Sequence, residues 1–375
     1  MKNRIGIVGG GQLGRMLAFS AKQLGFDVHV IDPTPQSPAG QVVDSQIIAD
    51  YKDRKAITKL AAKSDFLTFE VELANADILN QLTKKGVRVN PSAKTLAIIK
   101  DKFVQKTFLR KNKIPTANFV LVEDEQKIEI LIEKFDFPFL LKARFDAYDG
   151  RGNALINNKA DFKKGLKKLK GRKLYIEKFV PFSKELSVVV ARSIKGDLAV
   201  FPVCETFHKN NICHVVMAPA RVSKKVKKNA ELLAKKVMRS LKGAGVFGIE
   251  MFLTKTGKVL INEIAPRVHN SGHYTIEACQ TSQFEQHIRA ITGLPLGKTN
   301  MTSPAAVMIN ILGERTGFTE LKGLKKALAL SEVFVHIYGK IETKIDRKMG
   351  HITALGKNLT DAYRKARLAR KYISI

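Results

Sequence analysis

The sequence has no long apolar run, few cysteines and few acidic residues relative to basic ones. A membrane-spanning helix needs about 20 mainly apolar residues, and no stretch of the 375 residues approaches that length. Gln12 and Arg15 interrupt the N-terminal apolar stretch, which argues against a signal peptide. Cys204, Cys213 and Cys279 lack metal-ligand spacing and are odd in number. We therefore expect free thiols in a reducing cytoplasm.

The shortage of acidic residues leaves a formal net charge of +31, from 65 Lys and Arg against 34 Asp and Glu. Such a charge can indicate a nucleic-acid or membrane-surface partner. Lysine pairs such as Lys163-Lys164 and Lys224-Lys225 are instead scattered over helix-like stretches, without interleaved aromatic residues. We expect a lysine-rich solvated surface, with no nucleic-acid and no membrane partner. A non-catalytic nucleic-acid binder is the alternative that the charge alone favours.

The chain is long enough for two or three domains, since 45% of its residues are hydrophobic. Its first hundred residues alternate short apolar strands with helices, which is typical of a doubly wound parallel sheet. A strand-rich region follows, with expected helices at 226–241 and 274–291, and then short strands and a helix at 359–371. We expect an α/β and α+β fold with domains at 1–101, 102–297 and 298–375, the last of them small and β-rich.

A glycine loop, Gly9-Gly-Gly-Gln-Leu-Gly14, lies between the first expected strand and helix. Its glycines allow backbone to approach a phosphate, and the helix N-terminus favours an anion. Asp32 follows at about the distance of a ribose-binding acid. A nicotinamide-dependent dehydrogenase is therefore an alternative, although the loop alone is weak evidence for it.

Two acids, Glu250 and Glu263, lie in strand-like runs on either side of a tight-turn sequence. If Thr256-Gly257 forms a two-residue loop, Lys255 pairs with Lys258, and Glu250 lies opposite Glu263. Directly opposed carboxylates repel each other, and Mg²⁺ would relieve that repulsion through hard oxygen ligands. The alternative is a register that differs by one residue and leaves the two acids unrelated.

Two further segments have polar groups in apolar surroundings. Lys142 lies in an apolar strand and precedes the glycine-containing loop Tyr148–Asn153, which is suited to closing over phosphates. The segment Glu177–Val180, followed by Glu185, offers extended backbone to a purine edge and an acid to a ribose. A lysine whose stem reaches water, an ordinary Asp-Gly turn and a plain edge strand are the structural alternatives.

Clusters of charge also follow other strands. The segment 261–273 has a carboxylate, an amide, an arginine and two histidines in thirteen residues after an apolar strand. Glu70 and Glu72 lie at the usual ligand edge of a parallel sheet, or are surface acids. Near the C-terminus, Lys340 and Arg347 lie beside glycines, as in a phosphate clamp or a solvated loop. The amphipathic helix at 359–371 predicts docking without chemistry.

The order of these parts resembles the ATP-grasp superfamily and, within it, the N5-carboxyaminoimidazole ribonucleotide synthetase family. The resemblance runs from about residue 3 to about residue 370. The motifs that support it are Gly9-Gly-Gly-Gln-Leu-Gly-Arg-Met16, Tyr148-Asp-Gly-Arg-Gly-Asn153, Asn262-Glu-Ile-Ala-Pro-Arg267, His269-Asn-Ser-Gly-His273 and Arg347-Lys-Met-Gly-His351. This sequence departs from many relatives at Asp146-Ala147, where they have two glycines, and at Val268, where they have proline.

The resemblance implies that ATP and bicarbonate form carboxyphosphate, whose carboxyl group passes to the amine of 5-aminoimidazole ribonucleotide (AIR). The reaction belongs to de novo purine synthesis, and other ATP-grasp carboxylate-amine ligases are the alternative within the superfamily. Mg²⁺, a cytoplasmic location and a homodimer are also implied. Fungal and plant forms have a fused carboxylase domain; because the chain ends at Ile375, a separate N5-carboxyaminoimidazole ribonucleotide mutase is expected to take the product.

The resemblance also implies roles for particular residues. Glu250 and Glu263 would ligate Mg²⁺. Arg267, His269 and Asn270, together with Lys340, would be catalytic. The residues expected to bind AIR are Gly11, Gln12, Leu13, Glu70, Tyr148, Arg151, Lys340 and Arg347. The residues expected to bind ATP are Lys102, Lys142, Tyr148, Asp149, Gly150, Arg151, Gly152, Asn153, Glu177, Lys178, Phe179, Val180, Glu185, His208, Asn262 and Glu263.

Overall fold

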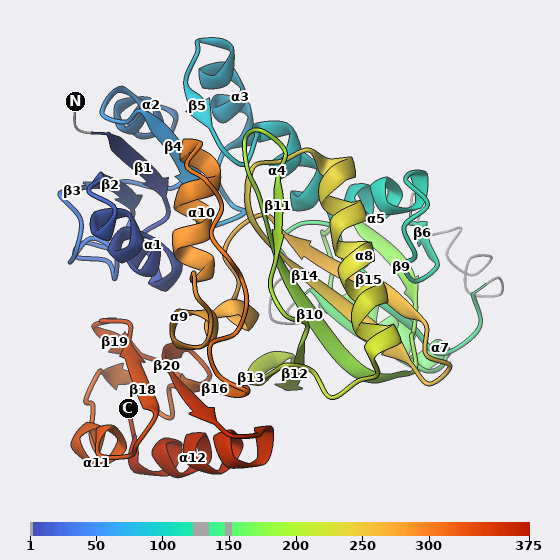
Figure 1. The fold of residues 1–375 in the computed structure, drawn as a ribbon. Coiled ribbons are helices and arrows are strands. Elements are labelled where there is room, and N and C mark those ends of the chain that lie inside the picture. Colours follow the sequence, from blue (N-terminus) through green and yellow to red (C-terminus); the bar gives the residue numbers. More distant parts are fainter. Residues whose placement is uncertain (1–2, 123–134, 147–151) are drawn as a thin grey trace.

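The structure is a computed structural model, and it describes residues 3–122, 135–146 and 152–375 (Figure 1). Four predicted site residues, Tyr148, Asp149, Gly150 and Arg151, lie outside this range. No helix in the described part of the chain is long and apolar enough to cross a membrane.

The N-terminal part forms the predicted parallel sheet, with strand order β3-β2-β1-β4-β5. β3 was not predicted, because its sequence Ser-Gln-Ile-Ile is only partly buried and has no clear alternation. Ser92 caps α4 by accepting a hydrogen bond from Thr95 N. The elements are β1 (Arg4–Val8), α1 (Gln12–Gln23), β2 (Asp27–Asp32), β3 (Ser45–Ile48), α2 (Arg54–Ala62), β4 (Phe66–Phe69), α3 (Ala76–Lys84), β5 (Arg88–Val89) and α4 (Ala93–Lys100).

A small four-stranded sheet follows, in the order β6-β9-β7-β8. One face packs on α7 through Phe139, Leu141, Ile176 and Phe162. Lys142 and Glu177 lie on the opposite face, since side chains alternate along a strand. The elements are α5 (Lys102–Lys111), β6 (Phe119–Leu121), β7 (Phe139–Ala143), β8 (Asn153–Ile156), α7 (Lys159–Lys168) and β9 (Leu174–Lys178).

The largest sheet has nine strands, eight of them in the order β15-β14-β10-β12-β13-β16-β20-β18, with β11 paired to β10. The C-terminal strands join this sheet because β16 pairs with β13. The predicted region 298–375 thus shares its main sheet with the preceding region (Figure 1). The strands are β10 (Phe182–Arg192), β11 (Leu198–Val200), β12 (Cys204–Lys209), β13 (Ile212–Ala218), β14 (Gly245–Thr254), β15 (Val259–Ala265), β16 (Ala305–Leu312), β18 (Val333–Ile337) and β20 (Lys348–Gly356).

The single helix predicted at 274–291 is wrong, because the structure divides it. Cys279 is extended and pairs with Met301, and Ser282 caps a new helix by accepting a hydrogen bond from Glu285 N. Gly293 ends that helix with φ +85°. The remaining elements are α8 (Lys224–Leu241), η2 (Asn270–Gly272), α9 (Thr275–Ala278), α10 (Gln283–Thr292), β17 (Gly317–Phe318), α11 (Leu324–Leu328), β19 (Glu342–Thr343) and α12 (Leu359–Tyr372).

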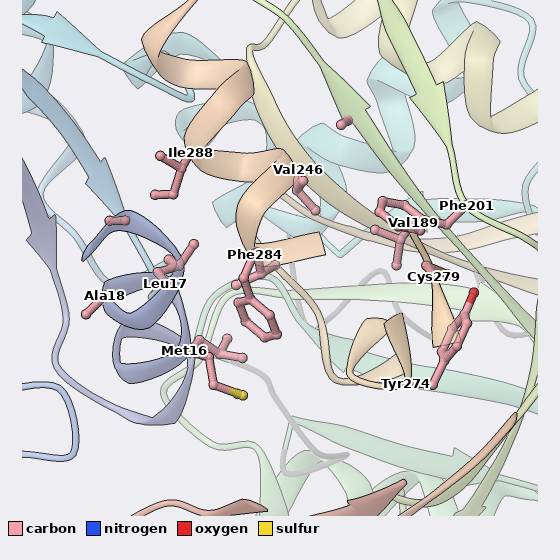
Figure 2. Close-up of a cluster of buried hydrophobic side chains, with 14 of the residues drawn as sticks. Met16, Leu17, Ala18, Val189, Phe201, Val246, Tyr274, Cys279, Phe284 and Ile288 are labelled. Carbon is pink, nitrogen blue, oxygen red and sulfur yellow. The ribbon is translucent and has the colours of Figure 1, made fainter. Parts of the chain in front are cut away.

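Helix α10 joins the N-terminal part to the large sheet. Figure 2 shows Met16 and Leu17 of α1 beside Phe284 and Ile288 of α10, with Val246 of β14 behind them. This shared apolar cluster fixes the glycine loop, which precedes α1, relative to the strands that bear the paired acids. The N-terminal sheet and the large sheet therefore approach each other around one candidate site.

Candidate active site

The paired acids are opposed, as predicted, although the predicted turn is wrong. Glu250 on β14 faces Glu263 on β15, but at the turn Leu253 faces Val259. The loop is therefore one residue longer than expected, with Gly257 at φ +80°. A register shift between Glu250 and Met251 leaves Asn262 as an extra residue in β15. The two one-residue deviations cancel, which restores the expected pairing of the acids.

The close approach of the opposed acids makes the ionised form of Glu250 less favourable. Burial, together with the nearby Glu263, raises the pKa of Glu250 to about 7. Lys102 pairs with Glu263. The described residues contain no group of three or more His, Cys, Asp or Glu side chains that could hold a metal. Two carboxylates fit Mg²⁺, because this ion usually takes one or two protein carboxylates and completes its shell with phosphate oxygens and water.

A buried charge cluster lies between α5 and the small sheet. The Glu177 carboxylate is 2.8 Å from Lys106 Nζ and 3.2 Å from Lys142 Nζ. Burial alone would lower the pKa of Lys142, but Glu177, Tyr175 and Glu263 together outweigh it and raise that pKa. Lys106 was not among the predicted site residues. Its position four residues after Lys102, on the same face of α5, was the available signal.

The region expected to receive the nucleotide base has a second ion pair. His208 Nδ1 lies 2.6 Å from Glu185 Oε2. Burial lowers the pKa of His208, but its contact with Glu185 gives a net increase. Lys178 Nζ donates to the Phe135 and Asp136 carbonyls at 2.6 and 3.1 Å. The Lys178 ammonium is therefore already engaged, whereas Glu185 and His208, both expected near the nucleotide, contact each other.

The glycine loop binds carboxylates of the chain itself. Glu70 accepts hydrogen bonds from Gly11 N and, at 2.6 Å, from Gly14 N. A Cβ at Gly11 would lie 2.7 Å from Glu70 Oε1, so a side chain at this position would displace the Glu70 carboxylate. Asp32 accepts from Gly10 N at 2.9 Å. The backbone amides that a dinucleotide phosphate would use are thus occupied, and Asp32 is engaged with the loop. Gln12 and Leu13 begin α1 beside Glu70.

A second acid after β4 reaches the other side of the site. Glu72 Oε1 lies 3.0 Å from Arg267 Nη2. Burial would raise the pKa of Glu72, but the hydrogen-bonded Arg267 and the nearby Lys102 together outweigh it, so that pKa is lowered. Among the described residues, the buried Arg267 Nε has no hydrogen-bond partner. The sequence does not decide whether Glu72 is an acid at the ligand edge or a surface acid. In the structure Glu72 pairs with Arg267 at the candidate site.

The segment after β15 holds His269 and Asn270, which begins η2. Burial and the nearby Arg267 lower the pKa of His269 well below its usual value, which favours a neutral ring. His269 Nε2 lies 3.5 Å from Glu250 Oε1. The paired acids, Arg267 and His269 therefore form one continuous polar site.

The C-terminal basic residues were also predicted to belong to the site. Burial, followed by repulsion from Arg347, lowers the pKa of Lys340 to about 7. Lys340 Nζ donates to the Lys348 carbonyl at 2.7 Å, and Arg347 Nη1 donates to the Glu342 carbonyl at 2.6 Å. The Glu70 carboxylate partly opposes this decrease, because its attraction for the Lys340 ammonium raises the pKa. Lys340 is therefore close to the glycine-loop side of the site.

The residues after the undescribed loop have ordinary backbone roles. Gly152 accepts from Ala143 N at 2.8 Å, and Asn153 pairs with Lys142 at the start of β8. Phe179 and Val180 connect β9 to β10, where the backbone remains the feature predicted to meet a purine edge.

This fold and site define an ATP-grasp protein, and family models agree along the chain. The matching models are the ribonucleotide synthetase preATP-grasp domain at residues 1–100, the ATP-grasp domain at 107–284 and the phosphoribosylaminoimidazole carboxylase C-terminal domain at 306–365.

Known proteins match over nearly the whole chain. The phosphoribosylaminoimidazole carboxylase of Ogataea methanolica is 47% identical over 96% of this chain, which spans 68% of that protein. The N5-carboxyaminoimidazole ribonucleotide synthase of Bacillus subtilis is 42% identical over 93% of this chain and 90% of its own length. The crystal structure of N5-carboxyaminoimidazole ribonucleotide synthetase from Thermotoga maritima, 48% identical, matches with a TM-score of 0.91 over 100% of this chain and 99% of that chain. The chain belongs to the N5-carboxyaminoimidazole ribonucleotide synthetase family and is a ligase.

Proposed function

We propose that this chain uses ATP and bicarbonate to carboxylate AIR to N5-carboxyaminoimidazole ribonucleotide, releasing ADP and phosphate. The observation that supports this most directly is the opposed pair Glu250 and Glu263 beside Arg267 and His269. A related structure, from Aspergillus clavatus, is in complex with ADP and AIR; it is 35% identical, has a TM-score of 0.91, and covers 99% of this chain and 98% of its own.

The ATP side of the site consists of lysines and acids. Glu250 and Glu263 would hold Mg²⁺, which neutralises charge on the phosphates when bound. Lys102 and Lys142 supply fixed cations for the phosphates, and Glu177 holds Lys142 in place. The adenine edge meets the backbone of 177–180. The ribose meets Glu185, with His208 beside it, and Asn262 lies next to the acids.

Bicarbonate and carboxyphosphate are placed at Arg267, His269 and Asn270. Arg267 offers a partly buried guanidinium whose Nε lacks a partner within the described residues, and such a group suits an oxyanion. Carboxyphosphate hydrolyses readily, so exclusion of water is part of catalysis. The segment 148–153, predicted to close over the phosphates and to give Tyr148 and Arg151 to AIR, lies mostly outside the described residues.

AIR is placed between the N-terminal loop and the C-terminal basic residues. Gly11, Gln12, Leu13 and Glu70 approach from one side, and Lys340 and Arg347 from the other. The amine of AIR must lose a proton as it attacks the carboxyl carbon. Orientation between these two sides is therefore the main contribution that the chain makes to this step.

The decisive experiment measures ADP release with Mg²⁺-ATP and bicarbonate, with and without AIR. Release that depends on AIR would support the proposal. No stimulation by AIR in folded protein would contradict it and favour another acceptor of the same ATP-grasp class.

We also propose a cytoplasmic homodimer that passes its product to a separate mutase. The three cysteines, which are free and buried, support a reducing compartment. Sedimentation equilibrium tests the dimer, and a coupled assay with purified mutase tests the hand-off. A monomer at micromolar concentration, or a product that the mutase does not consume, would contradict these two proposals respectively.

A further inference from the structure

The backbone and ring of His269 are held by two neighbouring elements. His269 N donates to Gln283 Oε1 at 2.9 Å, and Gln283 Nε2 donates back to the His269 carbonyl at 2.7 Å. Gln283 is fully buried. A Cβ at Gly248 would lie 2.5 Å from both Cβ and Cγ of His269, so the imidazole packs directly on a glycine of β14. The direction of the ring is therefore fixed.

The two ring nitrogens of His269 have different neighbours. Nδ1 lies 3.3 Å from Ser271 N and 2.8 Å from Ser271 Oγ. Ser271 Oγ lies 2.7 Å from Ser187 Oγ, and both serines are buried. Nε2 instead faces Glu250 Oε1. The two hydroxyls thus form a chain that ends at Nδ1.

The chain of contacts determines where the ring proton lies. A backbone N–H can only donate, so Nδ1 of His269 accepts from Ser271 N. A neutral imidazole with an accepting Nδ1 bears its proton on Nε2. The Ser271 hydroxyl can donate to the same nitrogen, and the Ser187 hydroxyl can then donate to Ser271 Oγ.

We propose that Ser271, through its backbone N–H and its hydroxyl, and Ser187, through its hydroxyl, are positioning residues that hold His269 as the Nε2–H tautomer. That tautomer donates a hydrogen bond to an anionic oxygen of bicarbonate or carboxyphosphate. This inference rests on the proposed function for the identity of that anion. A neutral imidazole that donates from Nε2 can stabilise negative charge without adding a second cation beside Arg267. The same tautomer prevents Nε2 from acting as a general base, because that nitrogen is already protonated.

The first test is spectroscopic and does not depend on turnover. The protein is labelled with ¹⁵N-histidine, and the His269 signals are identified by their loss in His269→Gln. We expect an unprotonated Nδ1 and a protonated Nε2 at pH 7.5. A protonated Nδ1, in either the neutral ring or the imidazolium, would overturn the inference. Failure of AIR-dependent turnover alongside the expected spectrum would instead count against the proposed function.

The second test compares two amides at position 269. The amide nitrogen of glutamine reaches about as far as Nε2, whereas that of asparagine reaches about as far as Nδ1. If donation from Nε2 is the contribution of the ring, His269→Gln should retain about tenfold more kcat than His269→Asn, the equivalent of about 1.4 kcal/mol. Equal or greater activity of the asparagine variant would overturn the inference.

The third test removes the hydroxyls. Ser271→Ala keeps the backbone N–H that donates to Nδ1 and removes only the hydroxyl. A minor share of the second neutral tautomer should therefore appear in the ¹⁵N spectrum, and kcat should fall more than KM for AIR changes. Ser187→Ala should have a smaller effect of the same kind, and the double variant should resemble Ser271→Ala. Ser193→Ala is the matched control, since Ser193 is a buried serine just beyond β10 whose hydroxyl donates to Asp197 at 2.9 Å. A wild-type spectrum and a wild-type kcat in Ser271→Ala would overturn the assignment of the two serines as positioning residues.

Discussion

The buried His287 provides a sharp test of how the N-terminal sheet is attached to the large sheet. Its Nδ1 accepts from Val246 N at 3.1 Å, and its Nε2 lies 2.8 Å from Thr68 Oγ1. Burial lowers the pKa of His287 to about 3. The folded protein therefore resists protonation of this ring, whereas the unfolded chain takes up a proton near the usual value of about 6.5.

The sign of the pH effect follows from these two values. Above about pH 6.5 the histidine is neutral in both states, so its full contribution to stability is present. As the pH falls from about 6.5 towards 3, the unfolded state binds a proton that the folded state excludes, and this contribution is lost. Between pH 8 and pH 5 the loss from His287 is about 2 kcal/mol, at about 1.4 kcal/mol per pH unit below pH 6.5.

The perturbation is His287→Asn, whose amide oxygen can still accept from Val246 N but which loses the ring and the bond to Thr68. At pH 8 we expect a loss of about 1–3 kcal/mol in unfolding free energy. Because asparagine does not titrate, the difference in unfolding free energy between wild type and variant should be about 2 kcal/mol smaller at pH 5 than at pH 8. Other buried groups, including His273 and Glu250, titrate in both proteins, so their effects cancel in the difference between the two unfolding free energies.

The assay is urea unfolding at several pH values, followed by far-UV circular dichroism because the chain has no tryptophan. Thr58→Ala is a suitable control, since Thr58 is an exposed helical residue whose hydroxyl donates only to the Arg54 carbonyl. Its gap from wild type should not change with pH. A gap for His287→Asn that stayed constant from pH 8 to pH 5 would refute a buried, neutral His287.

Three other predictions follow from the site. Glu263→Gln should abolish ATP turnover while leaving the circular dichroism spectrum intact; near-normal ADP release would make the metal assignment wrong. Lys106→Met should lower the unfolding free energy by about 3–5 kcal/mol, since it leaves Glu177 with only Lys142; a change below about 1 kcal/mol in urea unfolding would contradict a buried ion pair. AIR should raise the pKa of Lys340, because its phosphate favours the ammonium form. Calorimetry of AIR binding in buffers of different ionisation enthalpy should therefore show proton uptake near pH 7.5. Lys340→Met should lose this uptake, and equal uptake by both proteins would contradict the assignment of Lys340 to the AIR site.

The sequence predicted the order of elements well where apolar periodicity was strong, as in β1, β2 and α12. It failed where a local feature divided a periodic stretch. The pattern over 274–291 remained apolar, but an extended Cys279 and the capping Ser282 interrupt the helix. Long-range pairing with Met301 favours that interruption, and no local pattern reveals it.

The site was predicted unevenly for a related reason. The residue types in 261–273 and the spacing of Glu250 and Glu263 indicated chemistry directly, although the turn that justified the pairing was wrong. Lys106 was missed and the role of Glu72 was left undecided, because their partners, Glu177 and Arg267, are far away in sequence. A charged residue next to a predicted ligand shows its role only when the fold brings its counter-charge to it.

Strand β4 and the residues after it link the two halves of the site. Thr68, Glu70 and Glu72 occupy alternate positions, and each contacts a different element: α10 through His287, the glycine loop, and Arg267. Under the proposed function, a displacement of β4 would therefore disturb the AIR side and the carboxyphosphate side together. Because carboxyphosphate is lost to water unless its acceptor is already in place, one rigid strand would then hold both reactants in register. On that proposal, the predicted doubly wound sheet would contribute to catalysis mainly through the acids at the end of a single strand.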